Sequence, residues 1–181
     1  MRNVIYDDLY RYEGKKSLTL LARYVFFTAS FRYIYLYRKA KLASNSISKL
    51  FWGVLLRKCM LQTGIQIPSK TNIGRGFRIV HFGHIVINPA AIIGENFNIS
   101  HGVTIGHSEG RMWGSPTIGN NVVVQTNAVI VGKINIGNDV LIAPNAFVNF
   151  DVPDGSIVIG NPGKIIKSDK ASAKYIVFSV T

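Results

Sequence analysis

The sequence predicts an all-β fold with a helical N-terminus, in which a parallel β-helix follows a short helical segment. Aliphatic residues recur every six positions from residue 67 to residue 148, whereas the first 62 residues are basic, rich in aromatic residues and free of Pro. The chain has 181 residues, of which 48% are hydrophobic and 17% charged, enough apolar material for one compact domain with a short appendage. This composition excludes a disordered or collagen-like chain.

The N-terminal segment, residues 1–62, differs from the rest of the chain in charge. It carries 12 of the 21 Lys and Arg residues, 3 of the 9 acidic residues and 12 of the 20 aromatic residues, within a chain of net charge +12. Between Ser17 and Leu61 there is no Pro and a single Gly, so helices are predicted. Arg23 and Arg32 argue against a membrane span, because each costs roughly 2.5–3.5 kcal/mol at a bilayer centre.

Two interpretations of this basic segment remain open. Its apolar side chains either pack against the rest of the protein or contact an anionic membrane surface, where each Lys or Arg contributes about 1 kcal/mol. Nucleic acid is not an expected partner, because no recognised binding module occurs. The single cysteine, Cys59, and the lack of an apolar leader predict a cytoplasmic protein, with any membrane contact being peripheral and on the inner face.

The six-residue period defines the middle of the chain, residues 63–167. On an α-helix six residues turn through about 600°, so successive members could not share one face. On strands, positions i and i+4 both point inward, so each hexapeptide forms one short strand and one corner, and three of them form a coil of about 18 residues. The period slips by two residues before Ile87 and breaks again before Ile118. Its members are Ile67, Ile73, Ile79, Ile87, Ile93, Ile99, Ile105, Ile118, Val124, Ile130, Ile136, Ile142 and Val148.

Three stretches carry a resemblance to a known family. They are the repeats from Ile73 to Gly106 with their slip, the interruption HSEGRMWGSPT at residues 107–117, and IGNPGKII from Ile159 to Ile166. Together they resemble the hexapeptide-repeat acyltransferases of the serine acetyltransferase-like branch. This resemblance implies a left-handed parallel β-helix over residues 63–167 with a protruding loop at 107–117, a C-terminal tail at 168–181, a homotrimer, and acetyl transfer from acetyl-CoA to a hydroxyl.

Two histidines are candidates for the chemistry. Acetyl transfer needs a base that takes the proton of the alcohol, and His81 occupies the position of the family's catalytic histidine, so the resemblance assigns it this role. A corner histidine that only caps backbone carbonyls is the alternative. His101 follows 20 residues later, which is one coil plus the slip, so the two rings should stack on neighbouring coils. His101 is then either a substrate contact or a polar corner.

Further residues are candidates for contact with the two substrates. The candidates for acceptor contact are His101, Asn88, Arg111 and Trp113. By resemblance, acetyl-CoA lies in a groove between subunits, and the candidates for contact with it are Thr126, Pro144, Gly160 and Lys164. The alternative for Asn88 is a simple Asn-Pro turn. For Arg111 and Trp113 it is a mobile surface loop, and for Lys164 it is a solvated lysine. No metal is expected, because His101 and His107 are one hexapeptide apart and fall on different corners.

The sequence departs from serine acetyltransferases at three places. Gln66 stands where those enzymes have an aspartate that orients the base, Ser115 stands where they have a second histidine, and the N-terminal segment is shorter. At these three places the sequence resembles the O-acetyltransferases of bacterial surface polysaccharides, of the colanic-acid or capsule type. The predicted function is therefore O-acetylation of a sugar hydroxyl on a polysaccharide or its lipid-linked precursor. Serine O-acetylation for cysteine biosynthesis and a non-catalytic trimeric scaffold are the alternatives.

Overall fold

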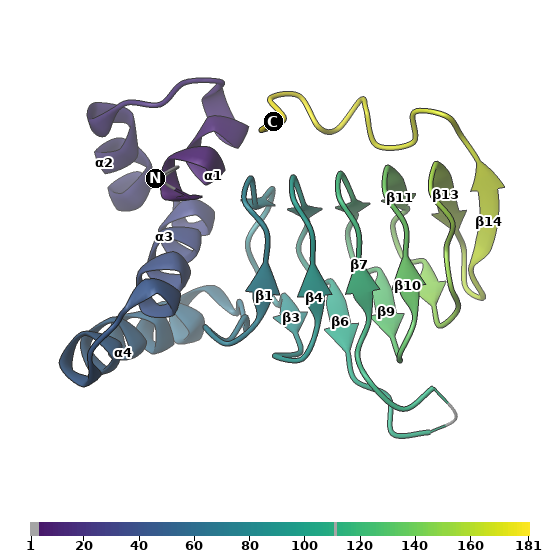
Figure 1. Cartoon of the computed structure of the whole chain (residues 1–181), viewed down its shortest axis with the longest axis horizontal. Coiled ribbons are helices and arrows are strands. Elements are labelled where there is room, and N and C mark those ends of the chain that lie inside the picture. Colours follow the sequence, from purple (N-terminus) through teal and green to yellow (C-terminus); the bar gives the residue numbers. More distant parts are fainter. Residues whose placement is uncertain (1–3, 111) are drawn as a thin grey trace.

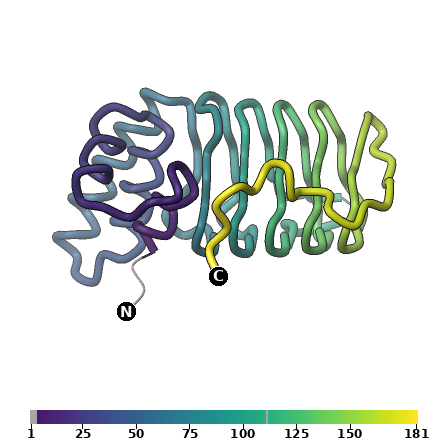
Figure 2. The backbone as a smooth tube through the Cα atoms, turned by 90° about the horizontal axis from the view of Figure 1, so that it is seen from above, coloured from purple at the N-terminus to yellow at the C-terminus, as the bar shows by residue number. Residues whose placement is uncertain are grey.

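The computed structural model describes residues 4–110 and 112–181 and shows two parts (Figure 1). Helices stand at one end of a long prism, which is built from three sheets of short strands around a single core. The C-terminal tail leaves the far end of the prism and returns along it towards the helices (Figure 2).

The prism confirms the prediction that each hexapeptide forms one short strand and one corner. Strands of two to four residues stack in three columns. Sheet 1 contains β1 (Asn72–Ile73), β4 (Ile92–Ile93), β7 (Thr117–Ile118) and β10 (Asn135–Ile136). Sheet 2 contains β2 (Arg78–Ile79), β5 (Asn98–Ile99), β8 (Val123–Val124), β11 (Val140–Ile142), β13 (Ser156–Ile159) and β14 (Lys164–Lys167). Sheet 3 contains β3 (Val86–Ile87), β6 (Thr104–Gly106), β9 (Val129–Val131) and β12 (Phe147–Val148).

The strand register explains both interruptions of the period. Ile79 pairs with Ile99, and Ile99 with Val124, in parallel. Ile87 pairs with Ile105 at the shorter, regular spacing. The slip and the break are therefore extra residues at corners, and the inward-facing positions stay aligned on both sides of them.

Corners and core follow from the residue types of the repeat. The inward-facing aliphatic residues are buried, and each contributes roughly 1.5–3 kcal/mol relative to exposure. At the corner between sheets 1 and 2, Phe77 and Phe97 stack with ring centroids 6.0 Å apart. Asn96 and Asn121 turn corners with φ of 56°, a left-handed conformation that asparagine adopts more readily than most residues.

The N-terminal segment is helical, as predicted for residues 17–61. It forms α1 (Val4–Glu13), α2 (Leu18–Phe27), α3 (Ala29–Leu42) and α4 (Ser46–Thr63), all within the predicted helical segment 1–62 apart from the last residue of α4. Ser17 and Asn45 cap α2 and α4 by accepting hydrogen bonds from the backbone N–H groups of Leu20 and Ser48. Gly64 ends α4 in the left-handed conformation, with φ of 70°. Within the described residues, no helix has the length and apolarity needed to cross a membrane.

A buried charged pair fastens the helices to the first coil of the prism. Arg38 of α3 donates from Nε to Oδ2 of Asp8 of α1 over 2.7 Å, and both side chains are almost fully buried. Arg38 also donates to the carbonyls of Ile73 and Gly74, and Asp8 accepts from the N–H of Phe77. These contacts join α1, α3 and the first coil.

Some aromatic and aliphatic residues of the N-terminal segment are buried, and others are exposed. Phe31, Tyr33 and Tyr37 of α3 are fully buried, and the two tyrosines donate to the carbonyls of Ile67 and Thr71. The packing interpretation therefore holds for these three residues. Other apolar residues of the helices remain exposed: Leu18, Phe26, Phe27, Leu42, Ile47, Leu50, Phe51, Val54 and Leu61.

The end of the chain forms structure that the repeat did not predict. After β13 the chain reverses, and β14 pairs with β13 in antiparallel fashion. The tail, residues 168–181, then lies along sheet 2 and is fastened to it by three side chains. Asp139 accepts from Ser172, Asn98 donates to the carbonyl of Tyr175, and Asn96 exchanges two hydrogen bonds with the backbone of Val180.

Candidate active site

One corner of the prism, between sheets 2 and 3, gathers five of the nine predicted site residues. They follow the strands of sheet 2 on successive coils, and backbone hydrogen bonds join the coils: the N–H of Asn127 donates to the carbonyl of His101, and that of Asn145 to the carbonyl of Thr126. The five residues are His81, His101, Thr126, Pro144 and Gly160.

A groove of about 420 Å³ lies beside this corner, on the outward face of sheet 2. It is called the corner groove below. One wall is the corner itself, the opposite wall is the C-terminal tail, and the floor is formed by outward-facing side chains of sheet 2. The residues that line it include His81, Thr126 and Pro144 at the corner, Arg78 and Val123 on the floor, and Lys174 and Tyr175 on the tail.

His81 lies on the two-residue slip, exposed to solvent. Its ring meets that of His101 on the next coil edge to face, with centroids 5.9 Å apart, which confirms the predicted stacking. Gly83 and His84 complete the slip with φ of 125° and 38°. The slip rests on the end of α4, because a Cβ on Gly64 would lie 3.0 Å from the backbone nitrogen of His84. The helical segment therefore supports the loop that carries His81.

The corner groove is cationic. Arg78 lies with its guanidinium 5.3 Å from the ring centre of Tyr12, and its buried Nε has no hydrogen-bond partner among the described residues. Lys174 adds a second cation, and no Asp or Glu lines the groove. Burial raises the pKa of Tyr12, so its hydroxyl stays protonated and donates to the carbonyl of Ile79. A groove with this charge suits a ligand that carries phosphates.

The two cations of the corner groove, Arg78 and Lys174, were not among the predicted site residues. Arg78 directly precedes the inward-facing Ile79, so strand alternation places it on the outward face. The repeat alone therefore carried a signal for it. Lys174 had no such signal, because the tail follows no period and its path depends on side chains of distant coils.

A second polar group lies at the opposite end of the sheet 3 strands, where the loop leaves the prism. Nδ1 of His107 lies 3.3 Å from the hydroxyl of Ser115, which donates to Oδ1 of Asn88 over 3.2 Å. Trp113, 69% exposed, meets the His107 ring at 5.3 Å. The structure thus brings the predicted Asn88 and Trp113 together, with His107 and Ser115 beside them. The predicted Arg111 lies outside the described residues.

The predicted acceptor contacts therefore lie at two corners of one chain. His101 is beside His81, whereas Asn88 and Trp113 are separated from it by the strands of sheet 3. Lys164 lies in β14 opposite Ile159, exposed and away from the residues that line the corner groove, because the chain reverses before it.

Other reactive groups have structural surroundings. Cys59 is buried in α4, and burial raises the pKa of its thiol, which keeps it protonated. Among the described residues, no three His, Cys, Asp or Glu side chains are grouped as metal ligands would be.

Comparison with known proteins shows what this chain is similar to. Over 71 residues it is 41% identical to the Escherichia coli protein named as a colanic acid biosynthesis acetyltransferase, WcaB, covering 39% of this chain and 44% of that protein. Over 108 residues it is 40% identical to serine acetyltransferase of Synechococcus elongatus, covering 59% of this chain and 44% of that protein. The chain thus spans less than half the length of these two relatives. No protein-family model matches it.

A solved structure extends the likeness to the whole architecture. The crystal structure of Neisseria gonorrhoeae serine acetyltransferase in complex with serine matches with a TM-score of 0.74 and 27% identity, covering 90% of this chain and 67% of that one. The resemblance to hexapeptide-repeat acetyltransferases of the serine acetyltransferase-like branch is confirmed. Within this branch, both the polysaccharide type and the serine type are represented among the similar proteins.

Proposed function

We propose that this protein is an acetyl-CoA-dependent O-acetyltransferase that acetylates a sugar hydroxyl of a cell-surface polysaccharide or of its lipid-linked precursor. The observation that carries the proposal is His81 on the wall of a cationic groove whose other residues include Thr126 and Pro144. Sequence similarity to acetyltransferases of both the colanic-acid and the serine type supports the reaction class.

The corner groove fits acetyl-CoA, which supplies an acetyl group activated as a thioester. Arg78 and Lys174 suit its phosphates, because both of these cations line the groove. Val123 and Pro144 offer apolar surface to the uncharged pantetheine arm. No carboxylate in the lining opposes the negative charge of this ligand.

In the proposed mechanism His81 acts as general base. Its ring nitrogen takes the proton of the sugar hydroxyl as the oxygen attacks the thioester carbon, a contribution of typically 10²–10⁴-fold. The carbon–sulfur bond breaks, the acetyl group stays on the sugar oxygen, and the imidazolium returns the proton to the departing thiolate. His101 faces the His81 ring edge to face and restricts its orientation, where the sequence has Gln66 in place of the family's aspartate.

We place the active site between subunits of a trimer with left-handed coils. Within one chain, the strands of sheet 3 lie between the His81 corner and the group of Asn88, His107 and Trp113. A neighbouring subunit is therefore needed to bring this corner and this group together. The outward face of sheet 3 supports this arrangement. Its outward residues include Val86, Val129 and Phe147, whereas the outward face of sheet 2 is covered by the tail.

The acceptor is tested by comparing substrates. We expect release of the CoA thiol when purified protein and acetyl-CoA are given polysaccharide or lipid-linked oligosaccharide, and none with free serine. Because an exposed indole can stack on a sugar ring, Trp113→Ala should raise the KM for the saccharide about 10-fold and leave that for acetyl-CoA unchanged. Release with serine alone would establish the serine acetyltransferase activity instead, and no release with any acceptor would favour the scaffold.

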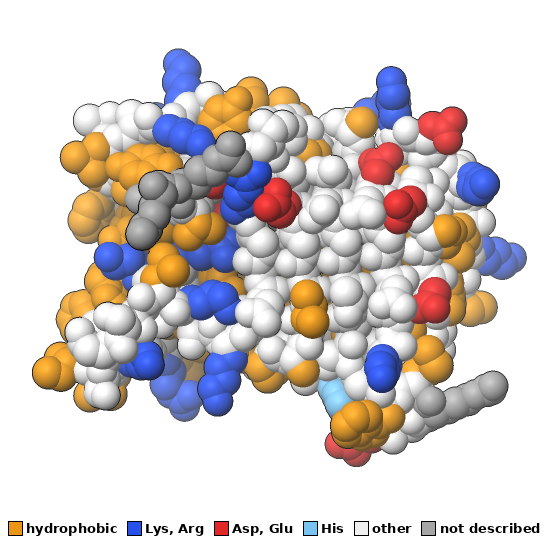
Figure 3. Space-filling view, in the orientation of Figure 1, with side chains coloured by type: hydrophobic (Ala, Val, Ile, Leu, Met, Phe, Trp, Pro, Cys, Tyr) orange, Lys and Arg blue, Asp and Glu red, His pale blue; other side chains and the backbone are white. Residues whose placement is uncertain are grey.

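We also propose that the helices hold the protein on the inner face of the cytoplasmic membrane. Figure 3 shows hydrophobic and basic side chains gathered over the helical end. Ile47, Leu50, Val54 and Leu61 form an exposed apolar stripe along α4, called the α4 stripe, with exposed fractions of 57–83%. No acidic residue occurs between Glu13 and Glu95, so this end of the molecule complements an anionic surface.

Vesicle flotation tests this contact. Anionic vesicles should carry the protein upward and neutral vesicles should not, because the basic helices add about 1 kcal/mol per cation only near anionic lipid. A double variant of the α4 stripe, Leu50→Ser with Leu61→Ser, should stay at the bottom of the gradient. Equal flotation of this variant and the wild-type protein would contradict the membrane contact.

A further inference from the structure

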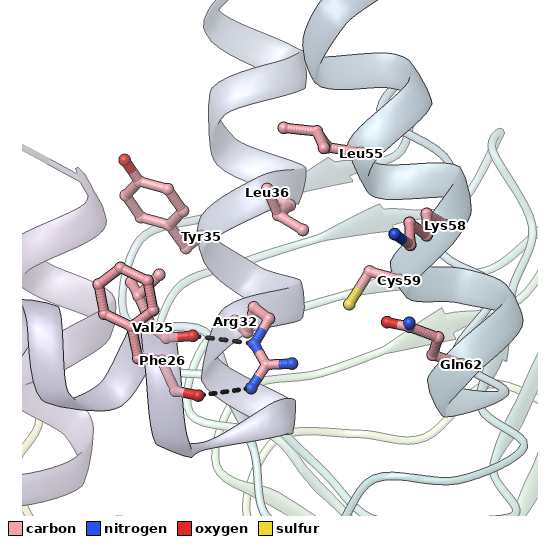
Figure 4. Close-up of a pocket in the computed structure, with 9 residues that line it drawn as sticks. All are labelled: Val25, Phe26, Arg32, Tyr35, Leu36, Leu55, Lys58, Cys59 and Gln62. Atoms are coloured by element: carbon pink, nitrogen blue, oxygen red, sulfur yellow. Dashed lines mark hydrogen bonds between the residues drawn. The ribbon is translucent and has the colours of Figure 1, made fainter.

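A second cavity, of about 430 Å³, lies between the helices and plays no part in the proposed acetyl transfer (Figure 4). It is called the helix pocket below. Its walls come from the end of α2, from α3 and from the last three turns of α4. The apolar side chains that line it are Val25, Phe26, Leu36 and Leu55.

Arg32, Lys58 and Gln62 lie towards the end of the helix pocket where α4 ends, whereas the hydroxyl of Tyr35, which also lines the pocket, points away from them (Figure 4). Arg32 is held in place by its hydrogen bonds from Nε to the carbonyl of Val25 over 2.9 Å and from Nη2 to that of Phe26 over 2.7 Å. Its third nitrogen turns towards α4, where Lys58 and Gln62 point into the same space (Figure 4). Leu55 lies furthest along the pocket from Arg32 and Gln62, and Leu36 lies level with Lys58 in this view (Figure 4).

The cations at this end lack an acidic partner. No Asp or Glu lines the helix pocket, and the sequence contains none from Gly14 to Gly94. Within α2, α3 and α4, the described ion pairs neutralise Arg38 through Asp8 of α1, but neither Arg32 nor Lys58. The pocket therefore combines an apolar length with Arg32, which is held by two hydrogen bonds, and the exposed Lys58, a pattern that suits an amphiphile with an anionic head.

We propose that the helix pocket binds one molecule of an anionic phospholipid, with its phosphate held by Arg32 and Lys58 and an acyl chain lying against Leu36 and Leu55. Charge complementarity favours this occupant over a second copy docked helix to helix, because Glu13 is the one exposed acidic residue among the described helices. The inference deepens the membrane contact proposed above: the α4 stripe provides general adsorption, and the helix pocket selects a phosphate-bearing lipid. It does not depend on the acetyl transfer.

Calorimetric titration with a short-chain lysophosphatidic acid, kept below its critical micelle concentration, tests the proposal on the full chain. We expect one lipid to bind per chain. Lys58→Gln should weaken binding about 10-fold, because a charge-assisted hydrogen bond is lost. Lys49→Gln provides the matched control, since Lys49 is an exposed lysine of the same helix outside the pocket, and it should bind as the wild-type protein does.

Two further variants distinguish binding in the helix pocket from adsorption through the α4 stripe. Leu55→Trp should fill the pocket and abolish titration, with thermal unfolding used to show that the variant is folded. The α4 stripe variant should lose flotation and keep lysophosphatidic acid binding, so failure of the membrane contact is distinguished from failure of the pocket.

Several outcomes would overturn the proposal. Equal affinity for a monoacylglycerol with the same acyl chain would show that the phosphate is not recognised. Equal affinity for glycerol phosphate would show that the acyl chain is not recognised. No heat of binding with the wild-type protein would exclude the lipid. A changed oligomeric state for Leu55→Trp, measured by light scattering, would identify the pocket as a contact between subunits.

Discussion

Replacing His81 by alanine is expected to lower the rate of acetyl transfer about 10²–10⁴-fold, the usual contribution of general acid–base catalysis. The side chain is exposed on the slip, and its described ring contact is with His101, so the fold should be unaffected. The measurement is initial-rate release of the CoA thiol with the saccharide acceptor, together with circular dichroism to confirm folding.

The slip itself supplies the control for this variant. His84, which directly follows Gly83, is a second exposed histidine; it does not line the corner groove, and asparagine tolerates its left-handed backbone. His84→Asn should therefore keep a rate within about 3-fold of the wild-type rate. A wild-type rate for His81→Ala, or an equal loss of rate in both variants, would contradict the role of His81 as general base.

The largest loss of stability is expected from Arg38→Met. Removing one partner of a buried ion pair leaves the other charge uncompensated and typically costs about 3–5 kcal/mol. Here Asp8 would lose its cation at a site with side-chain exposures of 3% for Arg38 and 0% for Asp8. Burial alone would lower the pKa of Arg38, but the Asp8 carboxylate more than offsets this and raises it, so the guanidinium of Arg38 is charged in the folded protein.

Urea unfolding measures this effect. The free energy of unfolding should fall by the amount stated for Arg38→Met, whereas Glu95→Gln, which removes the partly exposed pair with Arg75, should cost less than about 1 kcal/mol. The double variant Asp8→Asn with Arg38→Met should be more stable than the sum of the single losses predicts. An unchanged unfolding free energy for Arg38→Met would contradict the fastening role of the pair.

The prism could be predicted from the sequence because its contacts are periodic. Each inward-facing residue such as Ile99 or Ile130 meets its equivalent one coil away, so spacing along the chain translates into position. The same arithmetic placed His101 beside His81. It could not place contacts between segments without a period, such as Asp8 with Arg38 or Asn96 with Val180.

The candidate site shows the same division. Thr126 and Pro144 were predicted from the resemblance to a family, and both line the corner groove, whereas Arg78 was overlooked although its outward position follows from strand alternation. Lys174 and the path of the tail depend on hydrogen bonds with side chains on the coils, which no local pattern encodes. The loop contact between His107 and Ser115 similarly depends on a turn outside the repeat.

A crystal structure with bound CoA tests the central claim most directly. We predict that the thiol sulfur lies within about 3–3.5 Å of the reacting position beside the His81 ring, with the arm in the corner groove and the phosphates near Arg78 and Lys174. A CoA thiol bound elsewhere on the protein, with the His81 ring facing solvent and away from it, would contradict the proposed role of His81.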